Sequence, residues 1–172
     1  MGDPLGDLHD REAIRHLLNL YCRAFDRQDW DLVRAVYWPD AYDDHGAYKG
    51  GIEGLIEYAA DVMSRAEANQ HTLGTSIIEV EGDEAHCESY FVGRTLRKPE
   101  PDGRQLLTEM YGRYVDRFEK RDGEWRIAHR VCVLDMRDQR EQQLTPSPVH
   151  DEMVRGRRDR SDAIYQRPLA TR

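Results

Sequence analysis

Residues 104–136, RQLLTEMYGRYVDRFEKRDGEWRIAHRVCVLDM, decide the fold, because two long runs of β-branched and aromatic residues flank an Arg-Asp-Gly turn signal at 121–123. Two runs upstream are also rich in β-branched and aromatic residues, and they are bounded by Gly-Asp at 82–83 and Pro-Asp-Gly at 101–103. The pattern predicts four antiparallel strands: His71–Glu81, Glu84–Arg97, Arg104–Glu119 and Glu124–Met136. Several exceed the usual strand length of about 5–6 residues, so they must twist or bend around a core.

Three helices are predicted before these strands. Apolar residues recur at helical spacing over Arg11–Phe25, and Asp10 is a suitable N-cap. A second helix is expected to begin at an Asp29 cap and to stop before Pro39, and a third follows the Gly-Gly pair at 50–51. The segment 41–48 is expected to be irregular or strand-like. The fold class is therefore α+β, with three N-terminal helices packed on a strongly curved antiparallel sheet.

The length of 172 residues suits one domain with its own core. We assign residues 1–138 to this domain and 139–172 to a polar, Arg-rich C-terminal tail, because periodicity ends near Asp138. The tail holds seven Arg and five acidic residues. It also has apolar anchors such as Ile164 and Leu169, so we expect it either to be disordered or to pack on a neighbouring subunit of a homo-oligomer, a dimer or trimer.

The composition argues against several classes of partner. A formal net charge of -8 disfavours nucleic acid, since binding phosphate backbones needs a basic surface. The three cysteines are widely spaced, which indicates neither a disulfide framework nor a zinc site and fits a reducing compartment. No apolar stretch approaches the roughly 18 residues of a membrane span, and the N-terminus lacks a signal-peptide pattern. We therefore expect a soluble, cytoplasmic protein.

Asp26, His71 and Tyr21 are the candidate catalytic residues. Steps of four from Leu18 through Cys22 place Asp26 at the edge of the buried helical stripe, although it could also rotate into solvent. His71 opens the first long strand, and a carboxylate partner would fix its tautomer and make it a general base. Tyr21 could present its hydroxyl to the same cavity, or it could be a core aromatic residue.

Four further residues are candidates for substrate binding. Tyr42 and His45 lie in a run of titratable groups, Tyr-Asp-Asp-His, that is also ordinary turn chemistry and makes a weak metal site. His129 and Arg130 are adjacent on the last strand, and alternation sends them to opposite faces. Arg130 could hold a substrate oxygen, or it could form an ion pair with Asp116 or Asp135. We predict no metal and no cofactor.

With these residues in place, the sequence resembles the SnoaL-like branch of the nuclear transport factor 2-like superfamily. That group includes scytalone dehydratase, hexachlorocyclohexane dehydrochlorinase, bile acid 7α-dehydratase and ketosteroid isomerase. The stretches that carry the resemblance are YCRAFD at 21–26, DWD at 29–31, PDAYDDHG at 39–46, HTLG at 71–74, GRYVD at 112–116 and GEWRI at 123–127.

The resemblance implies a cone-shaped α+β barrel with a pocket at its open end. It also implies that Asp26 orients His71, that Tyr21 assists, and that Arg130 lines the pocket. The full set of pocket tyrosines and the second histidine of scytalone dehydratase are missing, so the substrate of that enzyme is not transferred.

Two functions follow as hypotheses. The first is a cofactor-independent lyase of the dehydratase kind, or an isomerase, in which Asp26 and His71 act as general base on a small, mostly apolar cyclic or polycyclic substrate. The second is a non-catalytic protein that binds a small molecule or serves as a structural subunit, as the β subunits of ring-hydroxylating dioxygenases do. The sequence does not identify the substrate.

Overall fold

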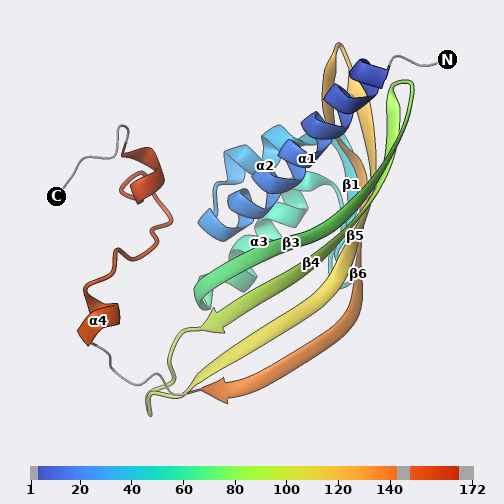
Figure 1. The fold of residues 1–172 in the computed structure, drawn as a ribbon. Helices are drawn as coiled ribbons and strands as arrows, with labels where there is room; N and C mark the ends of the chain where they lie inside the picture. The colour runs from blue at the N-terminus through green and yellow to red at the C-terminus, as the bar shows by residue number, and fades with distance from the viewer. Residues whose placement is uncertain (1–3, 143–147, 167–172) are drawn as a thin grey trace.

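The computed structural model describes residues 4–142 and 148–166. Its helices are α1 (Pro4–Arg27), α2 (Trp30–Val36), α3 (Ile52–Ser64), the short α4 (Pro148–Asp151) and the 3-10 helix η1 (Ala163–Tyr165). Its strands are β1 (Tyr37–Asp44), β2 (Lys49–Gly50), β3 (Ala66–Glu81), β4 (Glu84–Arg97), β5 (Gln105–Arg121) and β6 (Glu124–Gln142). Helices α1 to α3 lie together on the concave side of the long curved sheet (Figure 1). The predicted α+β class is confirmed.

The six strands form one sheet in the order β2-β1-β6-β5-β4-β3. The meander from β3 to β6 is antiparallel throughout, as predicted. However, β1 pairs with β6 in parallel, so the sheet is mixed and not purely antiparallel. The segment that we expected to be irregular or strand-like supplies the second half of β1, which begins earlier than expected, at Tyr37. Pro39 lies inside this strand and does not itself end α2.

Helix α1 is longer than predicted and begins at Pro4, so Asp10 is not its N-cap. The Asp10 carboxylate instead accepts hydrogen bonds from the indole N–H of Trp125 at 2.8 Å and from the Lys120 ammonium group at 3.0 Å. This ties the first half of α1 to the β5–β6 hairpin. The predicted cap of α2 is confirmed, because Asp29 Oδ1 accepts the backbone N–H of Leu32 at 3.1 Å.

The hydrophobic core lies between the three helices and the concave face of the sheet. Ile14 and Leu18 on α1 are almost completely buried, and Cys22 follows them on the same stripe. Burial of side chains of this size stabilises a fold by about 1.5–3 kcal/mol each. Asp26 is the next residue along this stripe, so the packing that holds α1 on the sheet also turns the Asp26 side chain inward.

Residues 148–166, which we call the C-terminal strap, pack against their own chain. Asp162 forms an ion pair with Arg27 at the end of α1, and Arg158 donates to the carbonyl oxygen of Ala66 at the start of β3 at 3.2 Å. Within this single chain the strap packs on its own helix and sheet edge, whereas packing on a neighbouring subunit stays a prediction. The expected boundary at residue 138 lies inside β6, and tail residues 143–147 and 167–172 lie outside the described residues. No helix among the described residues is both long and apolar enough to cross a membrane.

Candidate functional site

Asp26 and His71 form a carboxylate–imidazole pair across α1 and β3. Asp26 Oδ1 lies 2.7 Å from His71 Nδ1. Both carboxylate oxygens also accept the backbone N–H of His71 at 3.0 Å. A carboxylate offers only acceptors, so the network assigns the ring proton to Nδ1. The lone pair on Nε2 is then the basic position of the pair.

The register of the sheet decides where the His71 ring lies. His71 pairs with Gly93 on β4, and a Cβ at Gly93 would lie 3.6 Å from His71 Nε2. Because Gly93 has no side chain, His71 Nε2 faces only the backbone of β4 at this position. The Phe25 ring approaches the imidazole edge-on, with 6.5 Å between centroids. The side chains of Asp26 and His71 keep 18% and 14% of their exposure, so the pair is sheltered but not sealed.

A second carboxylate–imidazole pair lies at the end of β1. One oxygen of the fully buried Asp43 contacts His45 Nδ1, and the other accepts the Tyr37 hydroxyl at 2.7 Å. On the far side of the ring, His45 Nε2 lies 3.2 Å from the Tyr21 hydroxyl oxygen. The structure therefore places Tyr21 and His45 together. Among the described residues, no hydrogen bond joins Tyr21 to Asp26 or His71.

Arg130 lies beneath this second pair and is completely buried. Its Nε and Nη2 donate to the two carboxylate oxygens of Asp116, each at 2.6 Å. Its guanidinium carbon lies 4.0 Å from the ring centroid of Tyr21 and 4.2 Å from that of Tyr114. Of the two roles left open, the structure therefore shows the ion pair, and with Asp116, not Asp135. The third nitrogen, Nη1, has no hydrogen-bond partner among the described residues.

Aromatic rings fill the space between the two imidazoles. Tyr21 and Phe25 pack with 4.6 Å between centroids, and Phe91 stacks on Tyr114 at 4.2 Å. The Tyr114 ring in turn lies 6.3 Å from His45. These four rings are almost completely buried, so they separate the two polar pairs as packed core.

Burial keeps the phenols and thiols near the site protonated. It raises the pKa of Tyr21 and of Tyr114 well above the ordinary tyrosine value. It also raises the pKa of Cys22 and of Cys132 to about 12. The two imidazoles, and not these groups, are therefore the candidates for proton transfer near neutral pH.

Tyr42 and His129 lie on the opposite face of the sheet from Arg130. They are cross-strand partners in the β1–β6 pairing, and their rings contact each other with 5.3 Å between centroids. Because Asp43 and Arg130 point into the core, the alternation of strands sends Tyr42 and His129 outward. Tyr42 is exposed. Contrary to our expectation, the two residues do not line the site, and we exclude them from it.

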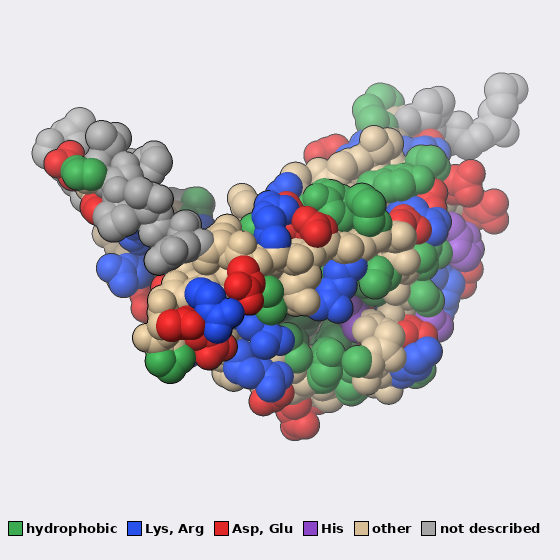
Figure 2. All heavy atoms as spheres, turned by 90° about the horizontal axis from the view of Figure 1, so that it is seen from below, with side chains coloured by type: hydrophobic (Ala, Val, Ile, Leu, Met, Phe, Trp, Pro, Cys, Tyr) green, Lys and Arg blue, Asp and Glu red, His purple; other side chains and the backbone are tan. Residues whose placement is uncertain are grey.

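The concave face is open at one end of the molecule. Figure 2 looks onto this end, where hydrophobic side chains surround a hollow and histidine atoms are visible at its base. Next to it, a cavity of about 890 Å³ is lined by Asp26, by residues 67–70 that precede His71, and by residues 155–158 of the C-terminal strap. Within the described ranges, no three His, Cys, Asp or Glu side chains are grouped so as to hold a metal ion.

A comparison with known protein families identifies the family to which this fold belongs. The profile described as the SnoaL-like domain matches residues 6–131, most of the chain. The chain belongs to the SnoaL-like domain family. The resemblance that the sequence motifs indicated is therefore confirmed. A curated relative, the uncharacterised protein Rv2910c of Mycobacterium tuberculosis (strain H37Rv), is 29% identical over 131 residues, which cover 74% of this chain and 86% of the relative.

Solved structures share the SnoaL-like fold. The hexachlorocyclohexane dehydrochlorinase LinA-type3 from Novosphingobium barchaimii aligns with a TM-score of 0.70 and 19% identity, over 84% of this chain and 100% of that chain. A candidate aromatic ring hydroxylase from Novosphingobium aromaticivorans aligns with a TM-score of 0.66 and 26% identity, over 78% and 94% of the two chains. The cone-like fold, with three helices on a curved mixed sheet, is thus common to these proteins.

Sequence reasoning about this SnoaL-like chain missed the partners that hold the second pair. Tyr37 was assigned to the end of the second helix, whereas its hydroxyl satisfies Asp43. Tyr114 was not singled out as a site residue, although it shares a strand face with Asp116. Tyr114, Asp116 and the buried Phe118 follow one another at every second residue of β5. This alternation alone would have predicted that they share the inward face of the strand.

Proposed function

We propose that this SnoaL-like protein is a cofactor-independent lyase, or an isomerase, for a small, mostly apolar cyclic or polycyclic substrate. The observation that carries the proposal is the 2.7 Å contact between Asp26 Oδ1 and His71 Nδ1, which leaves Nε2 free to accept a proton. A carboxylate in this position fixes the tautomer of the imidazole and stabilises the imidazolium once it forms.

In the elimination, His71 Nε2 takes a proton from an activated carbon of the substrate. The electron pair of the broken C–H bond forms the double bond, and the bond to the leaving group on the neighbouring carbon breaks. A leaving hydroxide takes up one proton and departs as water, whereas a leaving halide departs as the anion. In an isomerisation, His71 returns the proton to another carbon of the same molecule.

The structure suggests which group protonates a leaving oxygen. The Tyr21 hydroxyl is buried and engaged with His45, so it does not reach a substrate directly. His45 keeps 21% of its side-chain exposure and is held by Asp43. Buried aromatic rings separate His45 from the carbon at which His71 acts, so we assign the donor role to His71 itself. Its Nε2 passes the proton to the leaving oxygen and is again the free base.

Of the two roles that the sequence left open for Arg130, we use the ion pair and not the contact with a substrate oxygen. Its contacts with Asp116, Tyr21 and Tyr114 fix the rings beneath the second pair. In our proposal it positions Tyr21, and through that hydroxyl His45, without touching the substrate. The dehydrochlorinase named above, whose fold this chain shares, is named for an elimination, which supports the reaction class.

The test is a matched pair of Asp→Asn variants assayed on a panel of cyclic hydroxy ketones and halogenated rings. Asp26→Asn keeps an acceptor for the backbone N–H of His71 but removes the charge that stabilises the imidazolium. We expect elimination to slow on the order of 10³-fold, with the circular dichroism spectrum unchanged. Asp61→Asn, on the exposed face of α3, is the control and should leave the rate unchanged. Equal activity of the Asp26→Asn variant would rule out the mechanism.

The alternative is a non-catalytic subunit, and the likeness to the candidate ring hydroxylase favours it. A subunit of this kind would bind its partner tightly and would need no imidazole base. Co-purification with an iron–sulfur oxygenase α subunit encoded beside this chain, with no turnover on the panel, would support the alternative.

A further inference from the structure

The cavity beside the catalytic pair is closed on one side by the C-terminal strap. Asp26 and residues 67–70 line its inner side, and residues 155–158 line its outer side. The strap runs past the end of α1 and the start of β3, as the orange and red segment in Figure 1 shows. The volume of about 890 Å³ lies within the range of about 300–1,000 Å³ that is common for ligand pockets.

Several contacts fix the strap in this place. Asp162 is buried, and it accepts the backbone N–H of Arg157 at 2.8 Å and that of Ile164 at 3.0 Å. Its hydrogen bond with Arg27 holds the pKa of the Asp162 carboxyl well below its usual range. The Arg158 guanidinium group donates to the carbonyl oxygens of Ala66 and Glu67, each at 3.2 Å. The arginines that the strap brings to the cavity wall are therefore carried by an anchored segment.

The wall of the cavity carries excess positive charge. Four arginines line it, against the carboxylates of Asp26 and Glu67. Arg27 is paired with Asp162 and Arg155 with Asp151, and Asp26 is engaged with His71. Among the described residues, no carboxylate lies within ion-pair distance of the Arg157 or Arg158 guanidinium group, and the Arg157 side chain forms no hydrogen bond there. Hydrogen bonds from Ser161, together with the nearby charge of Arg157, lower the pKa of the Asp159 carboxyl group.

Asn69 supplies an independent sign of a ligand. Its side chain lines the same cavity, and both its amide nitrogen and its amide oxygen are buried without a hydrogen-bond partner in the described structure. Buried polar atoms of this kind are uncommon in folded proteins and call for a partner. Turned into the cavity, the Asn69 amide N–H₂ group can donate to an oxyanion that also pairs with a guanidinium group.

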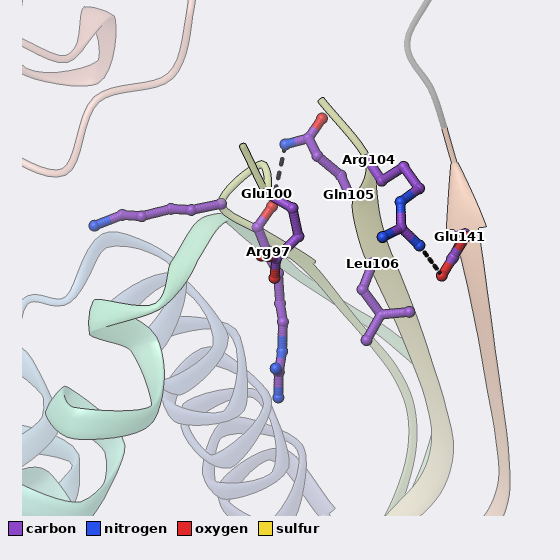
Figure 3. A pocket seen from close by; sticks show the side chains of 7 residues that line it. Arg97, Glu100, Arg104, Gln105, Leu106 and Glu141 are labelled. Carbon is purple, nitrogen blue, oxygen red and sulfur yellow. Dashed lines mark hydrogen bonds and ion pairs between the residues drawn. The ribbon is translucent and has the colours of Figure 1, made fainter. Parts of the chain in front are cut away.

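A smaller cavity of about 240 Å³ adjoins this one and shares Gln105 with it. There, Arg104 is neutralised by Glu141 at 2.9 Å, and the Gln105 amide donates to the Arg97 carbonyl oxygen at 3.1 Å (Figure 3). Arg97 and Lys98 add positive charge to the lining of this smaller cavity, against the single remaining carboxylate, that of Glu100. The smaller cavity therefore reinforces the potential of the larger one but is too small for a ligand of ordinary size.

We propose that the cavity binds the anionic end of the substrate, a carboxylate, sulfonate or phosphate, on Arg157 and Asn69, while the apolar ring system extends toward Asp26 and His71. The inference deepens the proposed function and rests on it for the position of the rings. It narrows the substrate class from any apolar cyclic molecule to one that carries an acidic group at one end.

The test uses two fluorescent probes that differ only in charge. 8-Anilinonaphthalene-1-sulfonate carries a sulfonate, and N-phenyl-1-naphthylamine has the same rings without it. In the full-length protein, Arg157→Ser should weaken binding of the sulfonate about threefold and Arg157→Glu about tenfold, as expected for a partly exposed charge pair. Arg157→Lys should retain the affinity within about twofold, and binding of the uncharged probe should not change in any variant. Added salt should weaken sulfonate binding alone.

Two measurements place the sulfonate in the cavity. The side-chain amide signals of Asn69 should shift in ¹H–¹⁵N spectra when the sulfonate is added. Arg137→Ser removes an exposed arginine of β6 that is not part of this cavity wall and should leave the affinity unchanged. The proposal is overturned if Arg157→Ser binds the sulfonate normally, if Arg137→Ser weakens it equally, or if the Asn69 signals stay in place. Neither probe undergoes elimination, so these outcomes are independent of the lyase test.

Discussion

Replacing Asp116 by Asn removes the carboxylate that neutralises buried Arg130. Both side chains are completely shielded from solvent, and two hydrogen bonds of 2.6 Å join them. Arg130 stays charged in any accessible pH range and cannot turn toward water from between the Tyr21 and Tyr114 rings. The variant therefore leaves a buried cation whose remaining contacts are ring faces and one amide oxygen.

The expected loss follows from that burial. Breaking a buried pair by removal of one partner costs about 3–5 kcal/mol, and we expect the lower end because Asn still accepts one hydrogen bond. With a urea m-value of about 2 kcal/mol/M, the unfolding midpoint should fall by about 1.5 M. Urea titration monitored by circular dichroism measures this shift. The double variant Asp116→Leu with Arg130→Met should lose less free energy of unfolding than Asp116→Asn, because no unpaired charge remains in it.

Asp135→Asn is the matched control. Asp135 accepts two hydrogen bonds from Arg113, at 2.9 and 3.0 Å, in the same two-pronged geometry, but its side chain is 41% exposed. Surface pairs contribute about 0–1 kcal/mol, so the midpoint should move by less than about 0.5 M. Equal shifts for the Asp116 and Asp135 variants would refute the argument that burial makes the inner pair indispensable.

Three further predictions concern titration, thiol reactivity and association. Because burial raises the pKa of Tyr21, Tyr37 and Tyr114, the folded state keeps protons that the unfolded state releases above about pH 10. The free energy of unfolding should then fall as the pH rises through 10, and absorbance at 295 nm should show fewer than nine tyrosines titrating before unfolding. Cys22 and Cys132, each with a pKa of about 12, should react with Ellman's reagent at pH 8 only upon unfolding, since the thiolate fraction is ~10⁻⁴. We also propose that the outer face of the sheet, where Ile77, Tyr90 and Val115 are exposed, joins copies of the chain; Val115→Lys should reduce the mass seen by light scattering, and a wild-type mass of 20.1 kDa would exclude the idea.

The meander was predictable because its signals are local. Each hairpin from β3 to β6 is marked by a Gly-containing turn between alternating runs, and Glu84–Arg97 has the bounds predicted for it. Strand β1 was harder to predict, because Tyr37 fits a helical stripe and Pro39 is read as a stop. Its parallel pairing with β6 joins segments about 90 residues apart and leaves no short-range pattern.

The position of a candidate site residue was predictable where a single helix or strand fixes the direction of its side chain. Steps of four along α1 placed Asp26 at the edge of the buried stripe, with rotation into solvent left open. His71 was a candidate from its place at the start of a strand, and the family resemblance strengthened the pairing. Alternation on β6 left two choices for Arg130, and the β1–β6 register settles them by directing Asp43 and Arg130 to the core. The strap contacts depend on Arg27 and Asp162, which are 135 residues apart, and no periodicity in the sequence reports such a pair.

The position of Arg158 has a consequence for the behaviour of the protein at high concentration. β3 is an edge strand of the sheet, and an edge strand offers unpaired carbonyl groups to any extended peptide that approaches. By donating to two carbonyl oxygens at the start of β3, the guanidinium group blocks the first hydrogen-bond acceptors that another strand would use. The tail of the chain thereby shields the first residues of this edge from pairing with another strand.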